Sequence, residues 1–272
     1  MAIPKKIHWC WLSGDPLPKA IQRCVNSWKR IMPDYEIILW DKSRFDIHSV
    51  RFVEDACAHK KWAYAADYIR LWALYTEGGI YLDSDVMVFK RFDKFLHHSA
   101  FSSIEYVPAM YVHRNEKYKY AGYGIQAAIL GAEKEHGWIK ACLEHYNRGK
   151  IFKMGCDDNL TDVEVCPWAL ARMAESYGFR YDLPIDEFQY LNDGIVIYPL
   201  KVFSMLYSKV DMQTFAIHVC EGSWFGDTYH RQRRSEPRWR KLHRYLCSNY
   251  RFFGMLHFRY KEFCRKNIAV KI

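Results

Sequence analysis

The stretch 62–75 constrains the fold more than any other part of the chain. Twelve of its 14 residues are apolar, which predicts a helix that is covered on nearly all sides. The two exceptions, Asp67 and Arg70, stand three positions apart and therefore share one face of the helix. Buried charges are costly unless they are paired. Either the two side chains form an internal salt bridge, or both face a polar ligand cavity, and the helix alone leaves both alternatives open.

The segments around this helix alternate between strand and helix patterns, which predicts an α/β layered fold. The expected strands are 7–12, 35–40, 80–82, 125–130 and 214–219, with a further apolar run over 86–89. The expected helices are 19–32, 61–77, 138–146 and 165–177. Two long irregular segments, 106–123 and 150–164, are candidates for substrate-binding loops because simple connections are shorter.

The apolar run 80–82 leads directly into Asp83, Ser84 and Asp85. In an extended chain, residues i and i+2 point to the same side, so both carboxylates are predicted to reach one cation. Ligands bind beyond the carboxyl ends of strands in open α/β sheets, and carboxylate oxygens suit Mg²⁺ or Mn²⁺. The alternative is a solvated turn, since Asp-x-Asp is a short motif. A calcium loop is disfavoured because Val88 stands where that loop requires glycine.

The run 66–85 resembles the sugar-binding region of glycosyltransferase family 32 and is distantly similar to the clostridial glucosylating toxins. Its sequence is Ala-Asp-Tyr-Ile-Arg-Leu-Trp-Ala-Leu-Tyr-Thr-Glu-Gly-Gly-Ile-Tyr-Leu-Asp-Ser-Asp. Two shorter blocks agree: 3–14 resembles the first strand of the family, and 217–224 resembles its C-terminal His…Gly-Ser-Trp segment. The resemblance implies a GT-A fold, a divalent cation (Mn²⁺ or Mg²⁺), a nucleotide-sugar donor and retention of anomeric configuration.

The resemblance also implies roles for individual residues. Asp83 and Asp85 would bind the metal, with His218 or Glu221 completing its shell, and Arg70 would join the two aspartates in catalysis. The implied donor-binding residues are Trp11, Asp67, Arg70, Tyr81, Ser84, Ser223 and Trp224. Trp11 would stack on the nucleotide base, although an ordinary core aromatic remains an alternative. Cys220 and Glu221 depart from the common family pattern, so the ligand at that end of the chain stays open.

The implied function is transfer of a hexose from a nucleotide diphosphate-sugar to a glycan acceptor, with a UDP-hexose such as UDP-galactose preferred. The segment 155–169 lacks the Thr-Gly-Pro seen in the mannosyltransferases, which leaves a GDP-mannose-dependent enzyme as the alternative. A non-catalytic sugar-binding subunit of a polysaccharide assembly complex is an alternative of another class. A phosphohydrolase is disfavoured because Met87 stands where that chemistry expects Thr or Val. The residues identify no catalytic nucleophile.

The net charge of +9 is concentrated in residues 228–272, which hold 13 Lys and Arg against two acidic residues. We therefore expect a GT-A catalytic domain over 1–227 and a basic, aromatic, helical extension over 228–272. Such an extension favours the surface of an anionic membrane, and helices packed on the domain are the alternative. A membrane surface suits an acceptor linked to a polyprenyl diphosphate, as in capsular polysaccharide synthesis. Nucleic-acid binding is disfavoured because it leaves the buried charged residues unexplained.

The compartment follows from the cysteines and from the hydropathy. The nine cysteines are scattered, and none are spaced as C-x-x-C, which predicts reduced thiols rather than a disulfide framework or a zinc site. No apolar stretch of about 20 residues predicts a membrane span, and the N-terminal pattern does not suit a signal peptide. The expected location is cytoplasmic, peripheral at the inner face of the cell membrane.

Overall fold

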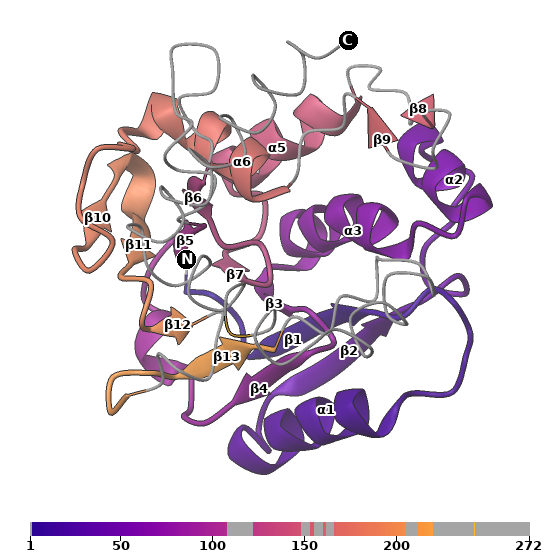
Figure 1. The fold of residues 1–272 in the computed structure, drawn as a ribbon, viewed down its shortest axis with the longest axis horizontal. Helices are drawn as coiled ribbons and strands as arrows, with labels where there is room; N and C mark the ends of the chain where they lie inside the picture. The colour runs from indigo at the N-terminus through magenta and orange to yellow at the C-terminus, as the bar shows by residue number, and fades with distance from the viewer. Residues whose placement is uncertain are drawn as a thin grey trace, which may run out of the picture. The chain divides into compact units, whose positions relative to one another are not determined.

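The computed structural model describes residues 2–107, 122–147, 153–154, 160–161, 166–204, 211–219 and 242 (Figure 1). The chain divides into two compact units. The first contains Met1–Ile104 and Ile125–Trp224, and the second contains Glu105–Gly124 and Phe225–Ile272. The first unit carries the helices and nearly all of the strands described below, whereas residues 105–106 and 123–124, at the ends of two strands, belong to the second. The expected helical extension over 228–272 lies outside the described residues apart from Leu242, so that expectation stays a prediction.

The main sheet mixes parallel and antiparallel strands in the order β10-β11-β5-β7-β3-β1-β2, and β6 pairs with β5. The strands are β1 (Lys6–Cys10), β2 (Glu36–Trp40), β3 (Gly79–Leu82), β5 (Ala100–Tyr106), β6 (Tyr123–Ile125), β7 (Ile129–Ala132), β10 (Gln189–Tyr190) and β11 (Ile195–Tyr198). Strand β1 runs parallel to β2 and β3, whereas β7 runs antiparallel to β3 and β5. This mixed sheet with its helices confirms the predicted α/β fold.

Helices α1 (Lys19–Ile31) and α3 (Trp62–Glu77) cover opposite faces of this sheet (Figure 1). Successive side chains of a strand point to opposite faces. On one face, Trp9 of β1 meets Trp28 of α1 edge-on, with ring centroids 5.9 Å apart. On the other face, the imidazole of His8 bonds the carbonyl oxygen of Gly78, where α3 ends, at 2.8 Å. Helix α3 therefore packs on the face of the sheet opposite to α1, against β1 and β3.

The remaining helices pack around α3. They are α2 (Arg51–Ala58), α5 (Gly137–Asn147) and α6 (Cys166–Ala174), with short 3-10 turns η1 (Asp93–Phe95), η3 (Glu175–Tyr177) and η4 (Asn192–Gly194). Helix α3 contacts α2 and α5, and α5 contacts α6. These contacts bury α3 on nearly all sides, as its composition predicts, although Trp72 remains partly exposed. Among the described helices, none is both long enough and apolar enough to cross a bilayer.

A second, three-stranded sheet holds the strand that follows the two aspartates. It consists of β12 (Phe203–Ser204), β13 (Ala216–His218) and β4 (Val86–Val88), in the order β12-β13-β4. A separate pair joins β8 (Lys153–Met154) to β9 (Leu160–Thr161). Helix α1 anchors β4, because the indole N–H of Trp28 donates to the carbonyl oxygen of Val86 at 2.7 Å. The chain thus leaves the main sheet between β3 and β4, at the aspartates.

The structure corrects one predicted strand and adds elements that the patterns missed. The single strand expected over 125–130 is wrong, because β6 ends at Ile125 and β7 begins at Ile129. The backbone between them bonds to other segments instead of continuing a ladder. Helix α2 and strands β5, β10 and β11 were not predicted. Most of the two expected substrate-binding loops, 106–123 and 150–164, lies outside the described residues.

Candidate metal and donor site

The two aspartates lie in a turn rather than on an extended strand. The N–H of Val86 donates to the carbonyl oxygen of Asp83 at 3.0 Å, which closes a turn over Asp83, Ser84 and Asp85. The predicted extended geometry is therefore wrong, because the chain must turn here to pass from the main sheet into the second one. The predicted convergence of the two carboxylates is nevertheless observed, and it is the turn that brings them together.

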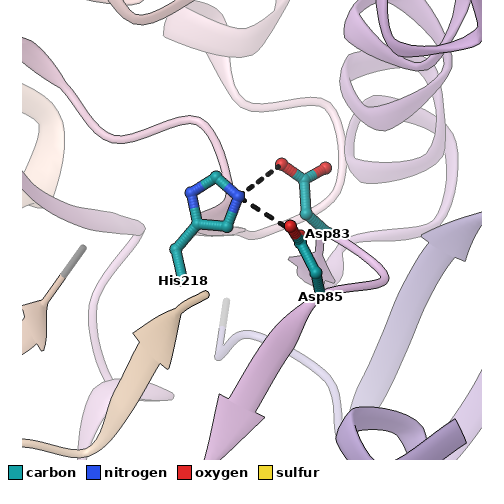
Figure 2. A group of neighbouring side chains, drawn as sticks. All are labelled: Asp83, Asp85 and His218. Atoms are coloured by element: carbon teal, nitrogen blue, oxygen red, sulfur yellow. Dashed lines mark ion pairs between the residues drawn. The ribbon is translucent and has the colours of Figure 1, made fainter. Parts of the chain in front are cut away.

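His218 completes a three-residue cluster with these carboxylates (Figure 2). Its Nε2 atom lies 3.2 Å from Oδ1 of Asp85 and 4.0 Å from Oδ2 of Asp83. The antiparallel pairing of β13 with β4 sets His218 opposite Val86. The N–H of Val219 also donates to the carbonyl oxygen of Asp85 at 3.0 Å. The pairing of the two strands thus determines where the imidazole sits.

The donor atoms of this cluster suit a divalent cation. One ligand atom from each of Asp83, Asp85 and His218 lies within 4.8 Å of the other two. Two carboxylate oxygens with one imidazole nitrogen form a set that Mn²⁺ accepts, and the carboxylates also suit Mg²⁺. Asp85 is buried, and the other two side chains are half-buried, so the cluster is sheltered but keeps some exposure to solvent. The residues therefore fit the cation that the sequence predicts.

Arg70 of α3 lies next to the cluster, and each nitrogen of its guanidinium group has a partner within the protein. Nη2 contacts Oδ1 of Asp67 at 2.7 Å and Oδ1 of Asp83 at 3.3 Å. Nη1 donates to the carbonyl oxygen of Ala127 at 2.7 Å, and Nε donates to that of Ala66 at 3.3 Å. The side chain is only 4% exposed. The internal salt bridge considered for α3 is therefore present, and it extends to one of the candidate metal ligands.

The charge of Arg70 is stabilised against burial. Burial disfavours the guanidinium, but Asp83, together with Tyr81 and Asp67, holds the pKa of Arg70 well above its ordinary value. The guanidinium carbon lies 4.7 Å from the ring centroid of Tyr81, a cation–π distance. Burial also raises the pKa of Asp67, to about 7, although the charge of Arg70 opposes this shift. Arg70 is thus a permanent buried cation that its neighbours compensate.

The other predicted donor-binding residues fall into two groups. Trp11 follows β1, and because β1 and β3 are parallel, it lies at the same sheet edge as Asp83. Its indole N–H donates to the carbonyl oxygen of Asp15 at 2.7 Å. Ser84 is half-buried within the turn. Glu221, Ser223 and Trp224 lie outside the described residues, so their predicted roles stay predictions, as do all contacts with a donor.

The structure brings two further groups to the site that sequence reasoning missed. The carbonyl oxygen of Ala128 accepts the N–H of Asp83 at 2.9 Å, next to the Ala127 carbonyl that holds Arg70. Carbonyl oxygens belong to every residue, so no sequence signal marks them. Cys166 at the start of α6 lies close enough to Asp67 to lower the pKa of that carboxyl against the effect of burial, and no sequence pattern around Cys166 indicated this contact.

Comparison with known proteins agrees with the middle block of the predicted resemblance. Residues 18–102 match the family described as the glycosyltransferase sugar-binding region containing DXD motif. The matched range contains Asp67, Arg70, Asp83 and Asp85, whereas His218 lies beyond it. The resemblance predicted for the block 66–85 is confirmed.

Curated relatives cover part of the chain. The chain is 34% identical to inositol phosphoceramide mannosyltransferase 3 of Schizosaccharomyces pombe over 103 residues. This matched region is 36% of this chain and 29% of that protein. Over 112 residues, the chain is 29% identical to subversion of eukaryotic traffic protein A of Legionella pneumophila, 31% of this chain and 17% of that protein. The chain thus spans less than a third of the length of either relative.

One solved structure of a glycosyltransferase involved in glycosylation of the major capsid of PBCV-1 is also similar to this chain. The similarity covers 80% of this chain and 94% of that one, at 13% identity and a TM-score of 0.42.

Proposed function

We propose that the protein is a metal-dependent, retaining glycosyltransferase that uses a nucleotide diphosphate-sugar, because residues 18–102 match the glycosyltransferase sugar-binding region containing DXD motif. The observation that carries this proposal is the convergence of Asp83, Asp85 and His218 within 4.8 Å. The buried guanidinium of Arg70 contacts that cluster, with Nη2 lying 3.3 Å from Oδ1 of Asp83. Paired carboxylates with an imidazole at a sheet edge suit the binding of a cation together with a diphosphate.

In this proposal, Asp83, Asp85 and His218 hold the cation. The cation supplies Lewis-acid stabilisation for the negative charge that develops on the departing nucleotide diphosphate. Arg70 orients the Asp83 carboxylate, because its Nη2 atom engages Oδ1 and leaves Oδ2 directed toward His218. Asp67 offsets the charge of Arg70 and holds the guanidinium in place through its 2.7 Å contact with Nη2. Trp11 stacks on the nucleotide base, and Glu221, Ser223 and Trp224 cover the diphosphate.

The donor is proposed to be a UDP-hexose such as UDP-galactose, with GDP-mannose as the second candidate. The name of the fission yeast relative, a mannosyltransferase, favours GDP-mannose. Against it, Cys166 and Pro167 stand in the segment where the mannosyltransferases carry Thr-Gly-Pro. Titrating UDP and GDP separately into the protein with Mn²⁺ in a calorimeter distinguishes the two candidate donors, because the nucleotide of the true donor should bind more tightly.

The acceptor is proposed to be a lipid-linked glycan, with the basic segment 228–272 holding the enzyme at an anionic membrane surface. This rests on its 13 basic and two acidic residues, since each basic residue near such a surface contributes about 1 kcal/mol. The test compares the full chain with a variant that ends at residue 227 in co-sedimentation with phosphatidylserine vesicles at low salt. Equal sedimentation of the two proteins contradicts the proposal.

The metal assignment is tested with Asp85→Asn and His218→Gln. Each should weaken Mn²⁺ binding in the presence of UDP or GDP by about tenfold or more, and should abolish donor hydrolysis and transfer. The matched control is Asp182→Asn, because Asp182 is an exposed acid that pairs with Arg180 on the surface. Full activity in either site variant, or activity that a chelator leaves unchanged, contradicts the assignment. Donor binding without hydrolysis or transfer would instead support a non-catalytic sugar-binding subunit.

A further inference from the structure

The break between β6 and β7 places two consecutive carbonyl groups against the site. Residues 126–128 are buried, with Gln126 fully enclosed. The carbonyl oxygen of Ala127 accepts Nη1 of Arg70 at 2.7 Å, and that of Ala128 accepts the N–H of Asp83 at 2.9 Å. Since adjacent carbonyls hold the two partners of one ion pair, the backbone of 126–128 sets the distance between Arg70 and Asp83.

Gln126 fixes this backbone at its N-terminal end. Its N–H donates to the carbonyl oxygen of Ser103 at 2.9 Å, and its own carbonyl oxygen accepts the hydroxyl of Ser102 at 2.7 Å. Both of these bonds tie the segment to β5. The side-chain amide reaches in another direction, because Nε2 donates to the carbonyl oxygen of Phe203 in β12 at 2.8 Å.

The side-chain bond connects the segment to the strand beside His218. Strand β12 pairs with β13, with Phe203 opposite Ala216, and β13 ends at His218. The amide of Gln126 therefore links the backbone that holds Arg70 and Asp83 to the sheet that carries the third candidate ligand. No other described side chain donates a hydrogen bond to the Phe203 carbonyl oxygen.

A purely space-filling role explains Gln126 poorly. Its Oε1 atom is buried and has no partner among the residues that the structure describes. An unsatisfied buried acceptor is costly, and an apolar side chain of similar length would fill the same space without that cost. The amide is useful here only through Nε2 and its bond to β12.

We infer that Gln126 is a positioning residue whose side-chain amide holds residues 126–128 against the second sheet and thereby aligns Arg70 and Asp83 with His218. The inference rests on the proposed function, because it assigns Gln126 a role in the affinity of that same metal and nucleotide site. Gln126 acts through the backbone carbonyls and does not itself touch the cation or the donor.

The test compares Gln126→Met with Gln189→Met. Gln189 is a matched control, since it is also buried and its amide also bonds backbone groups, those of Arg180 at 2.9 and 3.0 Å. It lies on β10, at the edge of the main sheet far from β3 in strand order. Both variants lose hydrogen bonds in the core. A merely structural role for Gln126 therefore predicts similar behaviour of the two proteins.

Two readouts separate the roles, both measured well below the unfolding temperature. In Gln126→Met, the Asp83 amide should exchange with deuterium faster than in the wild type, because its acceptor at Ala128 is no longer held. The affinity for Mn²⁺ with UDP or GDP should fall roughly tenfold, at the low end of the range for residues that orient metal ligands. Gln189→Met should leave both quantities at the wild-type values.

Gln126→Glu provides a second variant of the same shape if Gln126→Met does not fold. A protonated carboxyl can donate to the Phe203 carbonyl oxygen, whereas an ionised one cannot. Its Mn²⁺ affinity relative to the wild type at the same pH should therefore recover as the pH is lowered from 8 toward 6, since burial raises the pKa of a carboxyl.

The outcomes distinguish this inference from the proposed function. If the wild type binds neither Mn²⁺ nor nucleotide, the proposed function is overturned, and Asp83 amide exchange still tests the positioning role. If the wild type binds and Gln126→Met matches Gln189→Met in exchange and affinity, the inference is wrong while the proposed function stands. A ratio for Gln126→Glu that stays reduced over the whole of this pH range also contradicts the inference.

Discussion

Arg70→Met should destabilise the protein strongly, because it breaks a buried ion pair with Asp67. Methionine retains most of the length of arginine but removes the cation that Asp67 contacts at 2.7 Å. The Asp67 side chain is 13% exposed, so the unpaired carboxylate must take up a proton to remain buried. Removing one partner of a buried ion pair typically costs about 3–5 kcal/mol.

The pH dependence follows from the cost of holding that proton. Because burial already raises the pKa of wild-type Asp67 to about 7, the extra loss through Asp67 begins above that pH, and each further pH unit costs the variant about 1.4 kcal/mol more than the wild type. The Ala127 carbonyl oxygen, which loses Nη1 of Arg70, adds about 1 kcal/mol. In the variant the folded state binds more protons than the unfolded state, so its stability falls as the pH rises. At pH 6, where Asp67 is mostly protonated in both proteins, this extra loss should be absent, and at pH 8 it should be about 1.4 kcal/mol.

Urea unfolding followed by tryptophan fluorescence at pH 6 and pH 8 measures this difference. The double variant Arg70→Met with Asp67→Asn should remove the extra loss at pH 8, since it leaves no carboxylate at Asp67 to neutralise. Arg180→Met is the control, because Arg180 forms an exposed pair with Asp182 that should contribute little. A loss below about 1 kcal/mol for Arg70→Met, well short of the cost of breaking a buried pair, would refute the reasoning, as would a loss that is equal at the two pH values.

Three other perturbations test the fold around the site. His8 is fully buried, and its Nδ1 accepts the indole N–H of Trp40 at 3.0 Å, while burial lowers the pKa of the imidazole. The stability of the protein should therefore fall as the pH drops below 6.5, by up to about 1.4 kcal/mol per pH unit. An NMR titration that shows His8 charged at pH 6 contradicts this. Trp28→Phe should cost roughly 1–3 kcal/mol in urea unfolding, because the buried Val86 carbonyl oxygen loses its donor, and unchanged stability would show that this bond contributes nothing. Gly131→Ala should lower the Tm, at a cost of about 1–3 kcal/mol, since the new Cβ would lie 2.1 Å from the ring of Phe101; an unchanged Tm would mean that the ring moves freely.

Local pattern alone was enough to predict the buried helix, its charged face and the position of the two aspartates. The composition of 62–75 requires burial on nearly all sides, and spacing of three residues brings Asp67 to Arg70, as the 2.7 Å contact confirms. The strand before Asp83 and the glycines before that strand follow from the same short-range rules. These features involve residues close together in the chain, so their geometry depends mainly on backbone periodicity.

Tertiary structure decided how the site is assembled. His218 reaches Asp85 only because β13 pairs with β4, and no local pattern specifies which strand a short apolar segment will join. The aspartates meet through a turn rather than along a strand, because the chain changes sheets between β3 and β4. The supports of Arg70 and Asp83 are backbone carbonyls of Ala127 and Ala128. Those atoms are the same in every residue, so only their placement in space could reveal that role.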